Sequence, residues 1–438
     1  MGTRLRVLHV LPHAGGGMGA VLRALLAAEA RGGGPYVHAV ASLEYLNEPT
    51  RRCCDALAVA WADELALRPR GELDTLVASA DLVLMHWWNH PYMTRLLFEG
   101  LPPSRLLLWS HVNGYWDPQS FLPELFDTAD LFVFATKASL GAPAVKRLAP
   151  GISGKFRVIR SCAGIPEGAG EPCPKVGPYQ IGYVGTVDPA KMCSHFLQIC
   201  AAVDLTTPCV VAGGPGHDAL RKTAEGLGIA ERFEVLGPVD DPKPLFRRFH
   251  AFAYPLNPSH YGTGEQVLVE AMAFGAVPVV LANPPERELV RHGETGLVAE
   301  GFGEFAAALR FLADHSAERD RMAMAGYRYV MENCGIDRSK DQFHALFAEL
   351  AALPKCPHRL SLPGIDGVTP GSPFHLFLSS SAGAPERDAA LAIAAGRRWR
   401  EVPQSFRCGT RGSPAHYLRL LGNDTCLERI CAVTAQMS

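Results

Sequence analysis

The chain has 438 residues, of which 48% are hydrophobic and 20% charged, and its formal net charge is −2. This length exceeds one ordinary hydrophobic core, so we expect at least two domains, and the balanced charge excludes nucleic acid as an expected partner. No apolar run approaches the roughly eighteen residues of a spanning helix, and the first run is too short for a signal peptide, so we expect a cytoplasmic protein without a transmembrane segment.

Short apolar runs alternate with helical periods through the first part of the chain. This alternation predicts βαβ units around a parallel sheet. The expected strands are 6–12, 36–42, 80–86, 105–111, 129–135 and 155–161, with a helix over 18–31. Residues 162–179 are rich in Gly and Pro and have no period, which indicates a linker.

The same pattern restarts after the linker and then becomes helical. The expected strands are 180–186, 207–214, 232–237, 250–256 and 276–282, with helices over 191–203 and through 301–353. We therefore predict an α/β fold of two Rossmann-like domains facing a central cleft, plus a C-terminal extension. The expected boundaries are 1–165, 178–335, a helix at 336–354 that returns to the first domain, and an extension of unknown role at 355–438.

A glycine-rich loop joins the first strand to the first helix. Gly15, Gly16 and Gly17 let the backbone approach a ligand closely, and the helix that follows favours an anion. Gly15, Gly17 and Ala20 also match a dinucleotide fingerprint loosely, although the acid it requires would be Glu44, which lies late. A phosphate or sugar loop, a dinucleotide loop and a flexible turn all remain open.

Polar and aromatic residues follow two of the expected strands. In open α/β sheets ligands bind beyond the carboxyl ends of the strands. A histidine there can bind a substrate or move a proton, and a tryptophan offers an apolar platform; a purely structural role is the alternative. The candidates on this side are His13, Trp87, Trp88, Asn89, His111 and Asn113.

In the second domain the loops after two strands hold a lysine and several small residues. Lys191, with Thr186 before it, follows the first strand of this domain, and a lysine there suits a phosphate. Gly213 and Gly214 follow the next strand, where a backbone passes close to a ligand. A solvated surface lysine is the alternative for Lys191.

The stretch HYGTGEQVLVEAMAFGAVPVV holds two carboxylates. Thr263 and Gln266 form a capping box, which predicts a helix that begins at Gly264. Glu265 then lies in the first turn and Glu270 about 7.5 Å further along the axis on another face, so the two are not a close acid–base pair. The helix around Glu270 is too apolar for this carboxylate to be merely solvated, so the carboxylate requires hydrogen-bond donors, and the hydroxyls of a bound ligand would serve. A buried structural hydrogen bond is the alternative.

Several motifs occur in the order typical of one enzyme family. The second domain resembles the nucleotide-sugar domain of GT-B glycosyltransferases, specifically the retaining family 4, and the first domain matches more loosely through its glycine loop and His111. The motifs that carry the resemblance are VGTVDPAKM, VVAGGPG, FEVLGPVDD, AYPLNPS, EQVLVEAMAFGAVPVV and PERELVRHGETGLV.

The resemblance implies roles for single residues. Glu270 matches the second Glu of the family's E-x₇-E motif, which implies contact with the ribose, and Lys191 matches a lysine that binds the diphosphate. Gly262 stands where the family has its first Glu, and Thr186 where it has an Arg. Glu265 is a candidate replacement for the missing Glu.

The implied function is that of a retaining glycosyltransferase that moves a sugar from a nucleoside diphosphate sugar to a small-molecule or glycan acceptor. The expected catalytic residues are His111, Lys191 and Glu265, and the nucleotide side includes Gly262–Gln266. We expect no cofactor and no metal, and a homodimer remains open. The alternatives are an epimerase or phosphorylase on the same fold, a silent nucleotide-sugar binding protein and an NAD-dependent dehydrogenase.

Overall fold

The computed structural model describes residues 4–148, 151–204, 206–263, 265–380, 383–406 and 411–435. They form two compact units, one of Met1–Ser161 with Ser339–Ser438 and the other of Cys162–Arg338. Gly264, expected at the start of the ligand-binding helix, lies outside the described residues.

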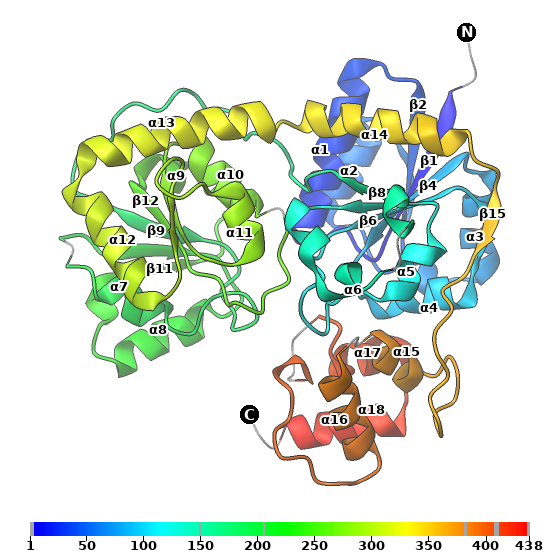
Figure 1. Cartoon of the computed structure of the whole chain (residues 1–438). Helices are drawn as coiled ribbons and strands as arrows, with labels where there is room; N and C mark the ends of the chain where they lie inside the picture. Colours follow the sequence, from blue (N-terminus) through cyan, green and yellow to red (C-terminus); the bar gives the residue numbers. More distant parts are fainter. Residues whose placement is uncertain are drawn as a thin grey trace. The chain divides into compact units, whose positions relative to one another are not determined.

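The first unit is built on a seven-stranded parallel sheet with the order β3-β2-β1-β4-β6-β7-β8 (Figure 1). Its strands are β1 (Leu5–Leu11), β2 (Tyr36–Ser42), β3 (Ala60–Ala62), β4 (Leu82–Trp87), β6 (Leu106–Ser110), β7 (Leu131–Phe134) and β8 (Phe156–Val158). Its helices before the linker are α1 (Gly16–Gly32), α2 (Glu48–Ala56), α3 (Arg70–Ser79), α4 (Pro91–Glu99), α5 (Pro123–Thr128) and α6 (Pro143–Lys146). β1, β4, β6 and β7 are almost wholly apolar and buried, as central parallel strands must be.

The last hundred residues of the chain complete this unit. After α14 (Ile336–Ala351), β15 (Cys356–His358) pairs antiparallel with β5 (Leu101–Ser104). The extension then forms α15 (Pro373–Ser380), α16 (Ala384–Ala394), α17 (Pro414–Leu421) and α18 (Thr425–Ala435), drawn in orange and red in Figure 1. These helices enclose a small core of their own around Phe377 and Tyr417, and the Tyr417 hydroxyl donates to Thr94 on α4. The extension is therefore folded and docked on the first domain.

The second unit holds a six-stranded parallel sheet with the order β11-β10-β9-β12-β13-β14. Its strands are β9 (Ile181–Val184), β10 (Cys209–Ala212), β11 (Phe233–Gly237), β12 (Ala251–Tyr254), β13 (Val277–Leu281) and β14 (Leu297–Ala299). Its helices are α7 (Phe196–Ala201), α8 (His217–Gly226), α9 (Lys243–Arg248), α10 (Gln266–Ala273), α11 (Pro284–Leu289), α12 (Phe302–Asp314) and α13 (Ser316–Asn333).

The expected α/β fold class is confirmed, with two Rossmann-like sheets. The expected strands are all present, and the short β3 and β14 had no clear sequence signal. The prediction of a helix over 191–203 is wrong for its first half, since α7 begins only at Phe196. Before it, the Lys191 and Cys193 amides donate to Asp188 O and Pro255 O instead of forming helical hydrogen bonds. Among the described residues, no helix combines the length and apolar character that crossing a membrane requires.

Candidate active site

The turn before α10 differs from the expected capping box. α10 begins at Gln266, and Glu265 precedes it with a left-handed backbone at φ 34°. A non-glycine residue is uncommon in this region and is retained only where its surroundings hold it. The capping-box prediction at Thr263 is therefore wrong. The left-handed turn instead directs the Glu265 side chain into the domain.

The Glu265 carboxylate is the centre of a buried polar cluster. Its Oε2 accepts a hydrogen bond from the Tyr254 hydroxyl at 2.6 Å and lies 3.1 Å from Lys191 Nζ. Burial raises the pKa of Glu265, but Lys191 and His260 lower it by a larger amount, so this pKa lies below its ordinary value. Burial likewise lowers the pKa of Lys191, and Glu265 more than reverses this shift. Lys191 and Glu265 thus form an ion pair, as expected of groups this close.

Gly262 makes room for this carboxylate. A Cβ atom at position 262 would lie 1.8 Å from Glu265 Oε1. The Oε1 atom itself is buried and has no hydrogen-bond partner among the described residues. A buried carboxylate oxygen without a donor is costly, so a ligand hydroxyl would be a favourable partner. Glu265 therefore occupies the space into which a side chain at position 262 would project.

Gln266 and Glu270 follow on α10. The Gln266 side chain accepts from Ala163 N at 2.8 Å and donates to Gly164 O at 3.2 Å, so it fastens the preceding linker instead of facing a ligand. Glu270 is partly exposed, and one of its oxygens accepts from Gln266 at 3.1 Å. Burial raises the pKa of Glu270. Glu270 thus retains an accessible carboxylate suited to hydroxyl groups.

The strand-end residues of this unit contribute mainly backbone. Gly213 has φ 135°, and its absent Cβ leaves space for Gly185 O, which would lie 1.8 Å from it. Gly213 and Gly214 therefore permit two loops to pack closely, which is a structural reason for glycine. Thr186 lies partly exposed after β9, and its carbonyl accepts from Tyr183.

The first unit contains a pocket of about 540 Å³ at the carboxyl ends of β1 and β4. The domain and the extension both line it, with His13, Glu44, Tyr45, Trp88, Arg411, Ser413, Ala415, His416 and Arg419. His13 stacks on Tyr45 with ring centroids 5.2 Å apart, and His416 stacks on Trp88 at 5.8 Å. Two of the acceptor-side candidates, His13 and Trp88, thus line the same pocket.

The pocket carries a net positive charge. The Arg411 guanidinium lies over the Trp88 ring at 5.6 Å, and Arg419 lies 3.5 Å from Glu44. Burial lowers the pKa of His13 to about 4 and that of His416 to about 3, so both are neutral at pH 7. Two arginines therefore face one glutamate. Both arginines come from the run RGSPAHYLR, whose two basic residues are the only trace of this positive charge in the sequence around the pocket-lining residues of the extension.

Three other acceptor-side candidates are buried and structural. Trp87 is fully buried, because it ends β4 inside the core. Asn89 is also fully buried, and its amide donates to Pro118 O, Ser120 O and Ser380 O at 2.8–3.1 Å. Asn113 is 2% exposed, and its side-chain oxygen accepts from the backbone of the following turn. All three side chains are almost wholly buried and lie outside the lining of the pocket, so they do not contact a ligand bound there.

The glycine loop opens onto solvent, but Glu44, which stands for the acidic residue that a dinucleotide fingerprint requires, is paired with other side chains. Gly16 and Gly17 have free space where a Cβ would lie, whereas Gly15 packs against Tyr45 and His13. Glu44 lies 3.4 Å from His90, as well as near Arg419. A carboxylate held in this way is not free for a ribose, which counts against the dehydrogenase alternative.

His111 lies just past β6, where a strand-end histidine was expected, but neither ring nitrogen is free. Its Nε2 lies 2.9 Å from His86 Nδ1, and its Nδ1 lies 2.8 Å from Ser161 Oγ. Burial lowers the pKa of His111 to about 3. His111 therefore has no free ring nitrogen for a substrate, and any role in catalysis would pass through His86 or Ser161.

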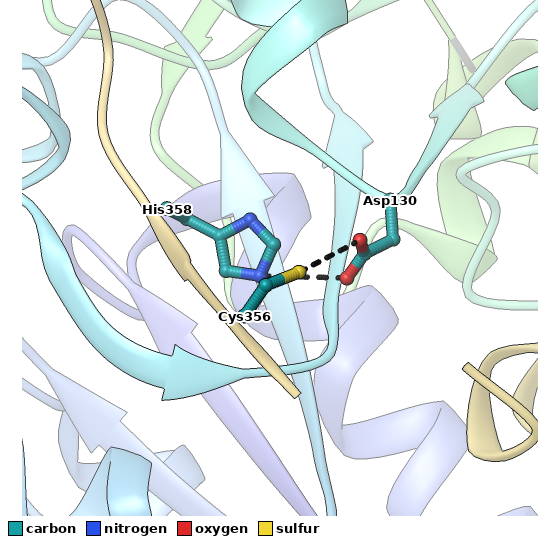
Figure 2. Close-up of side chains that lie close together, drawn as sticks. All are labelled: Asp130, Cys356 and His358. Atoms are coloured by element: carbon teal, nitrogen blue, oxygen red, sulfur yellow. Dashed lines mark hydrogen bonds and ion pairs between the residues drawn. The ribbon is translucent and has the colours of Figure 1, made fainter. Parts of the chain in front are cut away.

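Two clusters within the described part of the chain have the composition of metal sites. In the first, Cys356 and His358 of β15 lie beside Asp130 (Figure 2). The His358 nitrogens face Thr128 O at 2.8 Å and Ser104 O at 3.0 Å, and Asp130 accepts from Leu106 N at 2.7 Å. The cluster thus fastens β15 to the domain, and a metal would have to displace these bonds.

The second cluster joins His260 and Glu286 to Glu265. His260 Nε2 lies 3.1 Å from Glu286, and its Nδ1 accepts from Gly262 N at 2.9 Å. Lys191 and Tyr254 already contact one of the two Glu265 oxygens, Oε2. This cluster therefore positions the turn that carries Glu265.

Comparisons with known proteins agree with this geometry. Residues 172–329 match the family model described as glycosyl transferases group 1. A D-inositol 3-phosphate glycosyltransferase of Thermomonospora curvata is 29% identical over 37% of this chain and 41% of its own length. The Rhodococcus opacus protein of the same name is 31% identical over 37% and 39%. The chain thus spans about two-fifths of the length of the curated relatives it matches.

Solved structures share the fold at low identity. Anabaena Alr3699/HepE in complex with UDP-glucose is 15% identical and has a TM-score of 0.62, with 79% of this chain and 100% of that chain covered. Sucrose-phosphate synthase from Thermosynechococcus elongatus is 16% identical and also has a TM-score of 0.62, with 80% and 100% covered. Residues 172–329 are thus similar to the glycosyl transferases group 1, and the two Rossmann-like sheets have the fold of GT-B glycosyltransferases.

Proposed function

We propose that the protein is a retaining glycosyltransferase that transfers a sugar from a nucleoside diphosphate sugar to a hydroxyl of a small anionic acceptor. The family match of the second unit supports the reaction class. Retention follows from the resemblance to a retaining family, whose second Glu and lysine have counterparts in Glu270 and Lys191. We propose a cytoplasmic enzyme that works without a cofactor.

The observation that carries the proposal is the unpartnered oxygen of Glu265. Glu265 Oε1 lies where a side chain at position 262 would project, and it lacks a donor within the described part of the chain. A hydroxyl of the donor sugar would supply one. Glu265 then replaces the carboxylate that the family carries at position 262, reached through the left-handed turn.

Lys191 would stabilise the leaving diphosphate. It is 18% exposed and now paired with Glu265. As negative charge grows on the diphosphate oxygen, an adjacent ammonium stabilises the transition state more than the ground state, and this difference accelerates the step. Glu270, partly exposed on α10, would accept the ribose hydroxyls.

The pocket of the first unit is the proposed acceptor site. Stacked aromatic rings suit a ring-shaped acceptor, and Arg411 and Arg419 favour a phosphate or carboxylate on it. The curated relatives are named for inositol 3-phosphate, which is a ring-shaped anion of this class.

Incubating the protein with UDP-, GDP-, ADP- and TDP-sugars and measuring released nucleotide tests the proposal. We expect one donor to be consumed, faster when a cyclic polyol phosphate is added. Glu270→Gln should abolish donor binding, whereas Glu234→Gln, an exposed change on β11, should not. Absence of binding and release with every donor would overturn the proposal.

A further inference from the structure

Two histidines line the acceptor pocket of the first unit. His13 lies in the loop between β1 and α1, and His416 lies on α17 of the extension. The ring of His13 is parallel to that of Tyr45 within 4°, and the ring of His416 is parallel to that of Trp88 within 8°. Each imidazole is thus held in one plane against a larger ring.

Backbone amides decide which nitrogen of each ring carries the proton. The Gly15 amide donates to His13 Nδ1, and the Gly412 amide donates to His416 Nδ1, both at 3.0 Å. An amide N–H only donates, so the nitrogen that accepts from it cannot also bear a proton. Each ring is therefore neutral, with its single proton on Nε2, and both histidines are hydrogen-bond donors at that nitrogen.

The extension contains the motif of His416 twice. The runs GSPFH at 371–375 and GSPAH at 412–416 begin α15 and α17. In both runs the glycine amide donates to histidine Nδ1, and the serine Oγ accepts from the histidine amide. The Nε2 of His375 then lies 3.0 Å from Pro363 O, whereas no residue in the described ranges bonds the Nε2 of His416, which lines the pocket. The proton that the fold uses in one copy is left for a ligand in the other.

His13 is in the same situation in the domain. Its Nδ1 edge is turned to the Gly15 amide, and its Nε2 has no hydrogen-bond partner within the part of the chain that the structure describes. Burial lowers the pKa of His13 to about 4 and that of His416 to about 3, in agreement with two neutral rings near pH 7. Nε2 is therefore the polar atom that each ring can offer to a ligand in the pocket.

The pocket also contains three charged side chains. Arg411 and Arg419 flank His416 in the chain, and Glu44 is the one acidic side chain in the described lining. The contact with His90 lowers the pKa of Glu44 to about 2, so this carboxylate is ionised. The pocket therefore offers two guanidinium groups and two neutral N–H donors against a single carboxylate.

This set of donors fits a phosphate monoester better than it fits other anions. A phosphate monoester presents three terminal oxygens and a charge of about −1.5 to −2 at pH 7, whereas a carboxylate presents two oxygens and one charge. Guanidinium groups pair with either anion. The additional oxygen can accept from the imidazole N–H groups, and the second negative charge increases the attraction to a positively charged site.

We propose that His13 and His416 are specificity-determining residues that select an acceptor carrying a phosphate monoester, an inference that rests on the proposed function. Each ring donates its Nε2 proton to a phosphate oxygen, while Arg411 and Arg419 balance the charge of the phosphate. Because neither ring changes its charge state on binding, the affinity follows the ionisation of the ligand and not that of the protein.

The pH dependence of binding tests the neutral state of the two rings. The titratable and charged groups that face them are Glu44, Tyr45, His90, Arg411 and Arg419. In calorimetry, the Kd of inositol phosphate should fall as the pH rises through the second ionisation of the phosphate, near pH 6, and should then level off.

Inositol sulfate is the probe that isolates the protein. It has the same three terminal oxygens but keeps one charge at every pH of the measurement, so its Kd should stay constant through the range in which an ordinary histidine titrates, around pH 6.5. A Kd of inositol sulfate that rises with pH through this range would show a protonated histidine in the site and would overturn the proposal.

Paired substitutions separate the two nitrogens of each ring. Asparagine can accept from the backbone amide in place of Nδ1 but has no group at the position of Nε2, whereas glutamine places an amide N–H near that position. We expect His416→Asn to raise the Kd of inositol phosphate about 10-fold or more, as for the loss of a hydrogen bond to a charged group. His416→Gln should recover most of the affinity, and the same difference is expected between His13→Asn and His13→Gln. The Kd of neutral inositol should differ little within each pair.

His375→Asn is the matched control, because it makes the same change in the other copy of the motif, outside the lining of the pocket. It removes the contact with Pro363 O and should lower the Tm without changing the Kd of inositol phosphate. If a variant at His416 fails to fold, the pair at His13 decides, since His13 belongs to the domain and not to the extension.

Binding and turnover together distinguish this inference from the proposed function. Binding of inositol phosphate with the expected difference between asparagine and glutamine, but without consumption of any nucleotide sugar, would sink the proposed function and leave the phosphate site standing. Consumption of a donor with equal Kd values for inositol phosphate and inositol would overturn the phosphate site alone. Equal affinities of the asparagine and glutamine variants, or no binding of inositol phosphate with or without UDP, GDP or ADP, would also overturn it.

Discussion

Replacing Gly262 by alanine would place a methyl group in the space that the Glu265 carboxylate fills. The new Cβ would lie 1.8 Å from Glu265 Oε1 and 3.0 Å from His260 Nδ1. The backbone of Gly262 is not left-handed, so alanine adds no backbone strain. The carboxylate must move, and it then loses Tyr254 and Lys191 as partners.

The cost follows from the contacts that would be lost. Separating a buried ion pair costs about 3–5 kcal/mol. Lys191 is 18% exposed and the Glu265 side chain can swing, so we place the loss for Gly262→Ala at about 2–3 kcal/mol, near the lower bound. In a unit of this size that corresponds to a fall in Tm of about 4–12 °C.

A double-mutant cycle measures this interaction. Gly262→Ala should lower the Tm of the second unit in the wild-type background but cost almost nothing when Glu265 is already alanine. Gly303→Ala, an exposed helical site with nothing within 4 Å of the new Cβ, is the control and should be neutral or slightly stabilising. An equal cost of Gly262→Ala in both backgrounds would refute the claim that Glu265 occupies the space beside Gly262.

Three further outcomes are expected. Burial raises the pKa of Glu265, but Lys191 and His260 bring it below its ordinary value of 4.5, so the ion pair stabilises the fold above that pH and is lost as the pH falls through the lowered pKa. Wild type should be more stable to urea than Glu265→Gln at pH 7, and the difference should shrink as the pH falls below 4.5. Arg411→Ala should raise the KM of an anionic acceptor about 10-fold or more, as expected for the loss of a charge-assisted hydrogen bond. It should leave the KM of a neutral acceptor unchanged, and the exposed Arg52→Ala should change neither KM. Asn89→Ala should destabilise the first unit by about 2–3 kcal/mol, because three buried carbonyl oxygens lose a donor. At a temperature where this variant is folded, its acceptor KM should equal that of the wild type. A raised KM without lost stability would show that Asn89 contacts the ligand.

Much of the fold could be predicted because its signals are local. Central parallel strands are buried on both faces, so each appears as a continuous apolar run, and β1, β4, β10 and β13 were found in this way. The edge strands β3 and β14 have three residues each, which is too short for a period. The helices of the extension pack against α4 and against one another, so their arrangement depends on tertiary contacts.

The candidate site was predicted less completely, because the deciding contacts join residues far apart in the chain. Lys191 and Glu265 could each be named from a motif, but their pairing at 3.1 Å depends on a left-handed turn that no propensity favours. Asn89 and Trp88 are neighbours in the sequence, and only packing sends one into the core and the other into a pocket. Arg411 reaches that pocket from more than three hundred residues away.

Local periodicity and motifs read in order were enough to predict the two parallel sheets, the resemblance to a glycosyltransferase family and the residue types at the strand ends. The room that Gly262 leaves for Glu265, and the pocket that the extension lines together with His13 and Trp88, became visible only in the folded structure. Strand register and side-chain packing set these distances, and neither is recorded in any single stretch of the chain.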